Sequence, residues 1–256
     1  MKKLIVGNWK MNPTSLAEAK KIYSGVKTKV GSLRNVNVVI CSPAVYLGVF
    51  SATTKGKTGL LLGAQDTHWQ ESGASTGNIS PLMLKDLRTS YVLVGHSERR
   101  VAGETDEVVN FKIKAIQEYK MTPILCVGEK ERDESGHYLA VIKRQIEDGL
   151  EGLSKKASEK LVIAYEPVWA IGKDAKGVET PEGFNHNMIF IRKTLSNIFG
   201  QKEATKIPIL YGGSVSAKNA DSFLRDGRAD GLLVGRDSLT ASSFVEIVKI
   251  ANNSSK

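Results

Sequence analysis

Eight short apolar runs, rich in Val, Ile and Leu, constrain the fold of this chain more than any other feature of its sequence. Their starts lie 24 to 46 residues apart, and the runs occupy residues 4–6, 36–41, 60–64, 91–94, 122–127, 161–165, 207–211 and 231–234. Near-continuous apolarity is typical of strands that are buried on both faces of a parallel sheet. The long spacings leave room for a crossover helix after each strand.

Helical periodicity occurs between the runs. Intervals of three and four residues predict helical faces at Val108, Phe111, Ala115 and Tyr119, at Ile142, Ile146, Leu150 and Leu153, and at Met188, Ile191, Leu195 and Ile198. Thr180-Pro181-Glu182 has the pattern of a helix N-cap followed by a first-turn proline. Eight strand-helix units in 256 residues match a closed (β/α)8 barrel of the α/β class, with residues 1–256 as one domain. A doubly wound open sheet would give the same alternation.

Composition narrows the class of protein. No apolar run approaches the roughly 20 residues that cross a bilayer, and Met1-Lys2-Lys3 leads directly into a short apolar run, so we expect a cytoplasmic protein without a membrane segment. The net charge of +9 could attract nucleic acid, an acidic surface or a phosphorylated substrate. Its lysines are scattered, which favours a solvated surface over specific nucleic-acid binding. Cys41 and Cys126 each end an apolar run, which favours reduced core thiols over a disulfide or a metal site.

Glu166 has the most informative position of any acidic residue. It follows an apolar run and precedes Pro167, which lacks a backbone donor and disfavours helix at the preceding residue. The mostly apolar residues 168–172 follow, and a flap of this kind could exclude water. We therefore predict a strand-end carboxylate whose pKa is raised above its usual value of about 4.3, toward that of a useful base.

Polar residues also follow two other predicted strands, at 7–10 and at 95–100. In a barrel, the loops after the strands converge on one face, where active sites of this fold lie. Taken singly, His96 would be read as a satisfied core histidine, Lys10 as solvated and Asn8 as turn-forming.

Together, the order and spacing of seven motifs resemble the triosephosphate isomerase family along essentially the whole chain. The motifs are Gly7-Asn8-Trp9-Lys10-Met11-Asn12, Gly63-Ala64-Gln65, Thr76-Gly77, Gly95-His96-Ser97-Glu98-Arg99-Arg100, Cys126-Val127-Gly128-Glu129, Ala164-Tyr165-Glu166-Pro167-Val168-Trp169-Ala170-Ile171-Gly172 and Tyr211-Gly212-Gly213-Ser214-Val215.

This resemblance implies an isomerase that interconverts dihydroxyacetone phosphate and D-glyceraldehyde 3-phosphate through an enediol(ate), in glycolysis and gluconeogenesis, with no cofactor, metal or covalent intermediate. It implies that Glu166 is the catalytic base, His96 a neutral electrophile, Lys10 a cation that offsets substrate charge, and Asn8 a residue that fixes the pose. Two alternatives are another barrel enzyme acting on a phosphorylated sugar and a non-catalytic basic barrel. Each should lack part of this set of four residues, and none is missing here.

The resemblance also places Ser97, Glu98 and Cys126 near the site, although an ion pair with Lys10 would explain Glu98 equally well. Backbone amides at Gly172, Ser214, Gly235 and Arg236 are expected to bind the substrate phosphate. Arg236 stands where the family usually has glycine. A glycine-like backbone angle would strain it, and its side chain could add a positive contact or point to solvent.

Two further segments depart from the family pattern. The lid after Gly172, at residues 173–178, is about two residues longer than usual, which could affect its opening and closing more than the base. The segment from Gln65 to Ser80, which contains Thr76 and Gly77, resembles the loop with which family members grip a second subunit. This loop brings Thr76 close to the neighbour's active site, so a homodimer is implied. Asn78 replaces a glutamate that would pair with Arg99 of the neighbour, and we expect Glu104 to pair with Arg99 instead.

Overall fold

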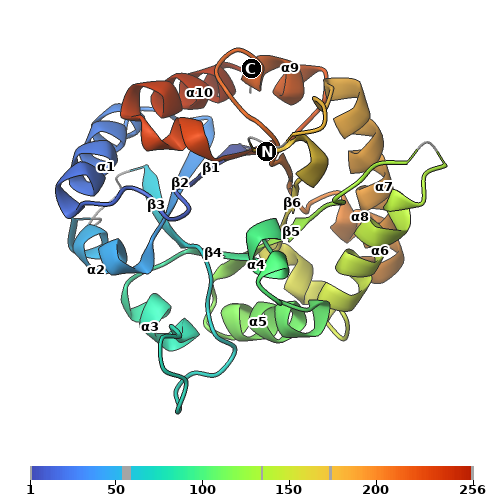
Figure 1. Cartoon of the computed structure of the whole chain (residues 1–256), viewed down its shortest axis with the longest axis horizontal. Coiled ribbons are helices and arrows are strands. Elements are labelled where there is room, and N and C mark those ends of the chain that lie inside the picture. The colour runs from blue at the N-terminus through green and yellow to red at the C-terminus, as the bar shows by residue number, and fades with distance from the viewer. Residues whose placement is uncertain (1, 54–58, 134, 173–174, 255–256) are drawn as a thin grey trace.

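Eight parallel strands close into a barrel in the computed structural model, which describes residues 2–53, 59–133, 135–172 and 175–254 (Figure 1). The strands follow one another around the barrel in chain order. They are β1 (Lys3–Asn8), β2 (Val36–Ser42), β3 (Leu60–Ala64), β4 (Tyr91–Val94), β5 (Thr122–Val127), β6 (Val162–Tyr165), β7 (Ile209–Tyr211) and β8 (Gly231–Val234). The predicted closed barrel is confirmed, and the open-sheet alternative is wrong.

Closure occurs where β8 pairs with β1, with Gly231 opposite Leu4. A Cβ atom at Gly231 would lie 1.9 Å from the Leu4 carbonyl oxygen, so the close approach of these strands requires glycine there. The last strand of the sequence is thereby held against the first, and the sheet has no free edge.

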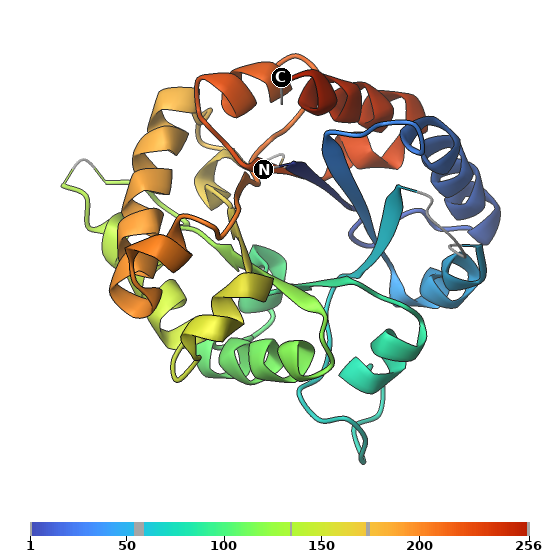
Figure 2. The same cartoon turned by 180° about the vertical axis from the view of Figure 1, so that it is seen from behind.

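Helices surround the barrel, as Figures 1 and 2 show from its two ends. They are α1 (Leu16–Val30), α2 (Ala44–Thr53), α3 (Pro81–Asp86), α4 (Ser97–Val101), α5 (Asp106–Glu118), α6 (Tyr138–Gly149), α7 (Pro181–Phe199), α8 (Gln201–Ala204), α9 (Ala220–Arg225) and α10 (Ala241–Asn253), with 3-10 turns η1 (Lys155–Lys160), η2 (Val168–Ala170) and η3 (Arg236–Leu239). The predicted N-cap of α7 is confirmed, because the Thr180 side chain accepts a hydrogen bond from the Gly183 N–H. None of the helices within the described ranges is long and apolar enough to cross a membrane.

The predicted apolar face of α5 is wrong in part. Phe111 is 42% exposed, and its ring packs 6.2 Å from that of Trp69. The buried apolar face consists of Val109, Ile113, Ala115 and Ile116. Lys112 is also buried, because its ammonium group pairs with Asp66 and Glu104. These ion pairs explain why a lysine is buried at a position where the apolar pattern alone does not predict one.

The barrel interior is a packed core. It is filled by Leu4, Val6, Val39, Cys41, Leu93, Ile124, Cys126, Val162, Ala164, Leu210 and Leu233. Both cysteines are free and buried, which confirms their prediction as core thiols. Because side chains fill the interior, the functional site must lie in the loops at one end of the barrel.

Candidate active site

Polar side chains from three distant parts of the chain meet at the carboxyl ends of the strands. Asn8 ends β1, His96 follows β4, and Glu166 follows β6. All three are buried, and His96 Nε2 lies 3.1 Å from Glu166 Oε1. Lys10 reaches the same region from the loop after β1. The structure therefore brings together the four residues to which the resemblance gave catalytic roles.

Hydrogen bonds hold Glu166 through both its backbone and its side-chain carboxylate. Its N–H donates to the Val127 carbonyl at 2.8 Å, which continues the pairing of β6 with β5 beyond the strand end. Pro167 then starts the turn η2. Oε2 accepts a hydrogen bond from the Ser97 N–H at 3.3 Å, so Ser97 contacts the predicted base directly.

His96 is held as the N-cap residue of α4. Its Nδ1 accepts a hydrogen bond from the Glu98 N–H at 3.2 Å. An accepting Nδ1 carries no proton, so the neutral ring has its proton on Nε2, which faces Glu166. The turn that leads into His96 depends on Gly95, which has φ +67°, a conformation that favours glycine.

Lys10 adopts a left-handed backbone conformation, with φ +52°. Two side chains hold it there. The Lys10 N–H donates to Asn8 Oδ1 at 3.0 Å, and Gln65 Nε2 donates to the Lys10 carbonyl at 2.9 Å. The ammonium group lies 2.6 Å from Glu98 Oε1, so the ion-pair interpretation of Glu98 is confirmed.

The charges of Glu166 and His96 are strongly coupled. Burial raises the pKa of Glu166, but the neighbouring His96, the Ser97 N–H and Lys10 outweigh burial, and this pKa lies below its ordinary value of 4.5. The prediction of a raised pKa is therefore wrong for the substrate-free site. Burial lowers the pKa of His96, but the Glu166 carboxylate outweighs it, and this pKa lies above 6.5.

Burial, reinforced by Glu166, raises the pKa of the Cys126 thiol well above its ordinary value, so this residue stays a neutral thiol beside the base.

A pocket of about 300 Å³ opens beside these residues. Its lining includes Asn8, Lys10, Gly172, Ser214, Gly235 and Arg236. Ser214 Oγ donates to the Ala170 carbonyl at 3.0 Å, which ties the loop after β7 to the flap after β6. The predicted phosphate-binding residues thus lie around one pocket.

The expected strain at Arg236 is wrong. Arg236 is not among the residues with positive φ, and Gly235 has the unusual angles instead, with φ −86° and ψ −106°. The glycine before η3 makes the turn, which leaves Arg236 in a conformation open to any residue. Its side chain is 92% exposed and points to solvent, with Asp237 3.9 Å away.

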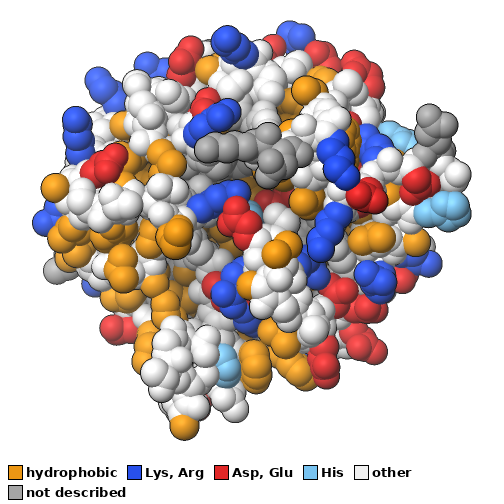
Figure 3. Space-filling model, in the orientation of Figure 1, with side chains coloured by type: hydrophobic (Ala, Val, Ile, Leu, Met, Phe, Trp, Pro, Cys, Tyr) orange, Lys and Arg blue, Asp and Glu red, His pale blue; other side chains and the backbone are white. Residues whose placement is uncertain are grey.

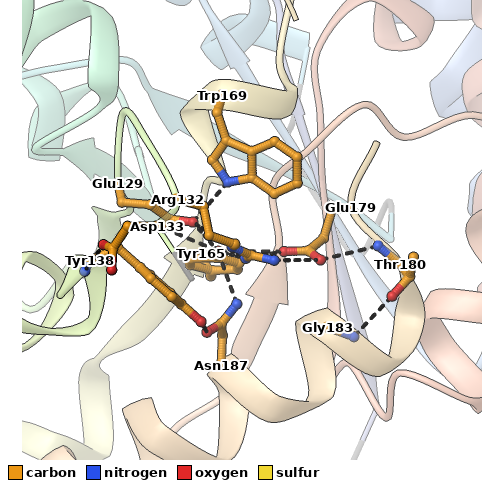
Figure 4. A network of polar contacts seen from close by, with 10 residues as sticks. All are labelled: Glu129, Arg132, Asp133, Tyr138, Tyr165, Trp169, Glu179, Thr180, Gly183 and Asn187. Carbon is orange, nitrogen blue, oxygen red and sulfur yellow. Dashed lines mark hydrogen bonds and ion pairs between the residues drawn. The ribbon is translucent and has the colours of Figure 1, made fainter. Parts of the chain in front are cut away.

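A polar network beneath the flap was missed from the sequence (Figure 4). Trp169 Nε1 donates to Glu129 Oε1 at 2.8 Å. Arg132 pairs with both Glu129 and Glu179, and its guanidinium lies 4.6 Å from the centre of the Trp169 ring. Tyr165 donates to Glu129 at 2.9 Å. Glu129, Tyr165 and Trp169 belong to family motifs, but their connection through Arg132 and Glu179 joins segments that are distant in the sequence. Lys173 and Asp174, in the predicted longer lid, lie outside the described residues.

The expected pairing of Arg99 with Glu104 is wrong. Arg99 Nη2 lies 2.9 Å from Asp66 Oδ2. Glu104 faces inward, where it pairs with Lys112 and accepts a hydrogen bond from the Gly95 N–H at 3.0 Å. Its carboxylate therefore holds the turn before His96 and has no free oxygen for the surface arginine.

No group of three or more His, Cys, Asp or Glu residues in the described part of the chain could hold a metal ion. The chemistry available at the site is that of a carboxylate, an imidazole and an ammonium group, and the residue that bears the ammonium group also lines the small pocket. These groups suit proton transfer on an anionic substrate.

The chain is similar to known proteins along nearly its whole length. The family model for triosephosphate isomerase matches residues 3–251. The triosephosphate isomerase of Dictyoglomus thermophilum is 46% identical over 252 residues, covering 97% of this chain and 99% of that protein. That of Dehalococcoides mccartyi is 44% identical over 250 residues, covering 97% and 96%. The crystal structure of triosephosphate isomerase from Bartonella henselae matches with a TM-score of 0.83 and 36% identity, covering 98% of this chain and 99% of that one. Agreement over nearly the full length of each protein shows that the chain belongs to the triosephosphate isomerase family, whose members are isomerases.

Proposed function

We propose that Glu166, His96, Lys10 and Asn8 carry the family's reaction in this chain, the interconversion of dihydroxyacetone phosphate and D-glyceraldehyde 3-phosphate in glycolysis and gluconeogenesis. One observation supports this most strongly. The Glu166 carboxylate lies 3.1 Å from His96 Nε2, so a base and a hydrogen-bond donor face the same small volume. Substrate binding must separate this contact, so that the carbonyl oxygen accepts the Nε2–H and the neighbouring carbon faces the carboxylate.

The chemistry needs both groups. A proton on carbon beside a carbonyl is weakly acidic, so its removal requires a base and a donor that stabilises the charge growing on the oxygen. Glu166 removes the proton from one carbon and returns it to the next. His96 donates its Nε2–H in a hydrogen bond to the carbonyl oxygen, and a proton passes from the neighbouring hydroxyl to that oxygen in the enediol(ate). The Lys10 ammonium offsets the negative charge of the enediolate.

Substrate binding should change both pKa values in useful directions. The carbonyl oxygen takes the Nε2–H that Glu166 holds in the free site, which removes the carboxylate as the main cause of the raised His96 pKa. Burial and Lys10 then both favour the neutral imidazole. Glu166 loses its nearest charge partner at the same time. Burial, the largest influence on its pKa, then makes it a stronger base.

The pocket beside Lys10 suits the substrate phosphate. Backbone N–H groups of Gly172, Ser214, Gly235 and Arg236 are the proposed donors, and the absence of large side chains at the first three lets the backbone approach the anion. Asn8 fixes the turn that places Lys10 between phosphate and reacting carbons.

We infer that the chain works as a homodimer in the cytoplasm. Exposed apolar side chains on α2, α3 and nearby loops support the dimer, and Figure 3 shows such side chains gathered over α2 and α3. They are Met11, Val45, Trp69, Leu82 and Met83. The loop from Gln65 to Ser80 projects beside α3 in Figure 1, and its residues Thr76 and Gly77 are exposed. A glycolytic role supports the cytoplasmic location.

A coupled assay in both directions tests this function. Purified protein, before and after treatment with a chelator, is assayed on the two triose phosphates and on a longer phosphorylated ketose. We expect turnover of the triose phosphates alone, unchanged by chelation. Activity only on the longer sugar would favour another phosphosugar enzyme, and inactivity on all three would favour a binding protein.

A further inference from the structure

Gln145 on α6 forms an unusual double contact with the main chain. This side chain is buried, its Oε1 accepts a hydrogen bond from the Gly128 N–H at 2.8 Å, and its Nε2 donates to the Gly128 carbonyl at 3.2 Å. One amide therefore satisfies both backbone groups of one residue, which fixes that residue in position and orientation. Gly128 directly follows β5.

Gly128 in turn lies against the main chain of Glu166. A Cβ atom at Gly128 would be 1.8 Å from the Glu166 carbonyl oxygen, so only glycine permits this approach. Hydrogen bonds flank the contact on both sides, from the Glu166 N–H to the Val127 carbonyl at 2.8 Å and from the Val168 N–H to the Glu129 carbonyl at 3.1 Å. Any displacement of Gly128 is therefore passed to Glu166.

Space for such a displacement is present. A cavity of about 1040 Å³ opens between α4, α6 and the loop after β5, and Gly128, Gln145 and Glu166 all line it. Gln145 reaches Gly128 from this side. Without its amide, the loop after β5 would have unpaired backbone groups and open volume beside it.

We propose that Gln145 is a positioning residue for catalysis, which acts by holding Gly128 against the backbone of Glu166. The inference rests on the proposed role of Glu166 as the base. Loss of the Gln145 contacts should slow the chemical step, because a small misplacement of the base lengthens the distance over which the proton moves. Substrate affinity should change little, since Gln145 hydrogen-bonds to Gly128, and neither residue is among those that line the phosphate pocket.

The test compares Gln145→Met with Gln117→Met. The side-chain amide of Gln117 on α5 also forms two hydrogen bonds with the main chain, donating to the Ala157 and Lys160 carbonyls at 2.8 Å each. These contacts lie where the chain enters β6, at the opposite end of the barrel from the active site. Both variants lose two hydrogen bonds. We expect kcat to fall about 10- to 100-fold in Gln145→Met with KM within about 3-fold of the parent, and kcat to be kept in Gln117→Met.

Gln145→Glu keeps the acceptor for the Gly128 N–H and adds no bulk. We expect the kcat of Gln145→Glu to lie between those of the parent and Gln145→Met, again with little change in KM. If Gln145→Met does not fold, Gln145→Glu alone tests the proposal. The proposal is overturned if folded Gln145 variants keep the parental kcat, if they raise KM alone, or if Gln117→Met lowers kcat equally. Inactivity of the parent would instead overturn the proposed function.

Discussion

Glu166 and His96 determine each other's protonation state in the substrate-free site. The folded state lowers the pKa of Glu166 below 4.5 and raises that of His96 above 6.5. The Glu166 contribution to stability is present above pH 4.5 and is lost as the pH falls through its lowered pKa. The His96 contribution is present below pH 6.5 and is lost as the pH rises through its raised pKa. Both contributions to stability are fully present between pH 4.5 and pH 6.5, so the pair stabilises the fold most in that range.

An NMR titration of His96 tests this coupling. In the parent we expect a pKa above 6.5, because the Glu166 carboxylate favours the imidazolium. In Glu166→Gln we expect a pKa below 6.5, because burial and Lys10 both lower it. Glu98→Gln is the control, since Glu98 raises the His96 pKa less than Glu166 does, and its loss should leave this pKa above 6.5. An equal pKa in the parent and Glu166→Gln would contradict the coupling.

The identity of the site residues could be predicted from the sequence, but their environment could not. Glu166 was identifiable because a carboxylate followed by proline ends an apolar run. Its lowered pKa depends on His96, which lies 70 residues away in the chain and meets it because β4, β5 and β6 pair side by side. The backbone of Arg236 was mispredicted for a local reason, because Gly235 takes the unusual angles one residue earlier.

At the scale of elements, the flap after β6 depends on charges buried beneath it. Arg132 pairs with Glu129 and Glu179, whose side chains are 1% and 2% exposed. Its guanidinium also lies over the Trp169 ring. The flap, the loop after β5 and the start of α7 thus meet at one arginine.

Arg132→Met should therefore destabilise the protein strongly. Two carboxylates would remain buried without their cation, and loss of one partner from a buried ion pair typically costs about 3–5 kcal/mol. Urea unfolding measures the change. Lys176→Met is the matched control, because Lys176 pairs with Glu131 on the surface and its loss should leave the unfolding midpoint unchanged. Equal midpoints for Arg132→Met and the parent would refute a stabilising role for the network.

Strands were predicted better than helix faces. Four of the eight predicted runs, 60–64, 91–94, 122–127 and 231–234, coincide with β3, β4, β5 and β8, because strands buried on both faces are almost wholly apolar. The face of α5 was mispredicted because Lys112 is buried by pairing with Asp66 and Glu104, and Phe111 packs on Trp69 outside the core. Such pairs join distant segments and leave no periodic signal.

At the scale of the whole molecule, the alternation of strands and helices predicted the layers, and the count of eight units in 256 residues favoured the closed barrel. An open sheet has the same alternation. The contact of Gly231 with Leu4 distinguishes the two, and it depends on the total number of strands and their register. The interior residues of the barrel follow from that closure.

The proposed dimer is testable by sedimentation velocity over a range of concentrations. We expect the parent to sediment as a dimer and Met11→Glu to shift toward monomer with a lower kcat, because Met11 is 92% exposed and a charge there would oppose burial. Met11 follows Lys10, whose carbonyl accepts a hydrogen bond from Gln65 at the start of the projecting loop. Ile189→Glu is the control, since Ile189 is an exposed apolar residue on α7. A parent that is monomeric at all concentrations, or an equal shift in both variants, would contradict the dimer.

The rate of Glu166→Gln tests the central claim most directly. The measurement is kcat for conversion of D-glyceraldehyde 3-phosphate to dihydroxyacetone phosphate by the parent, Glu166→Gln and Glu98→Gln, each verified as folded. Glu98→Gln controls for the loss of a nearby carboxylate, because Glu98 contacts Lys10 and is 59% exposed. If Glu166 is the carbon base, its variant loses roughly 100- to 10,000-fold in kcat, and the Glu98 variant loses far less. A Glu166→Gln variant that turns over at the parental rate would show that another group removes the proton.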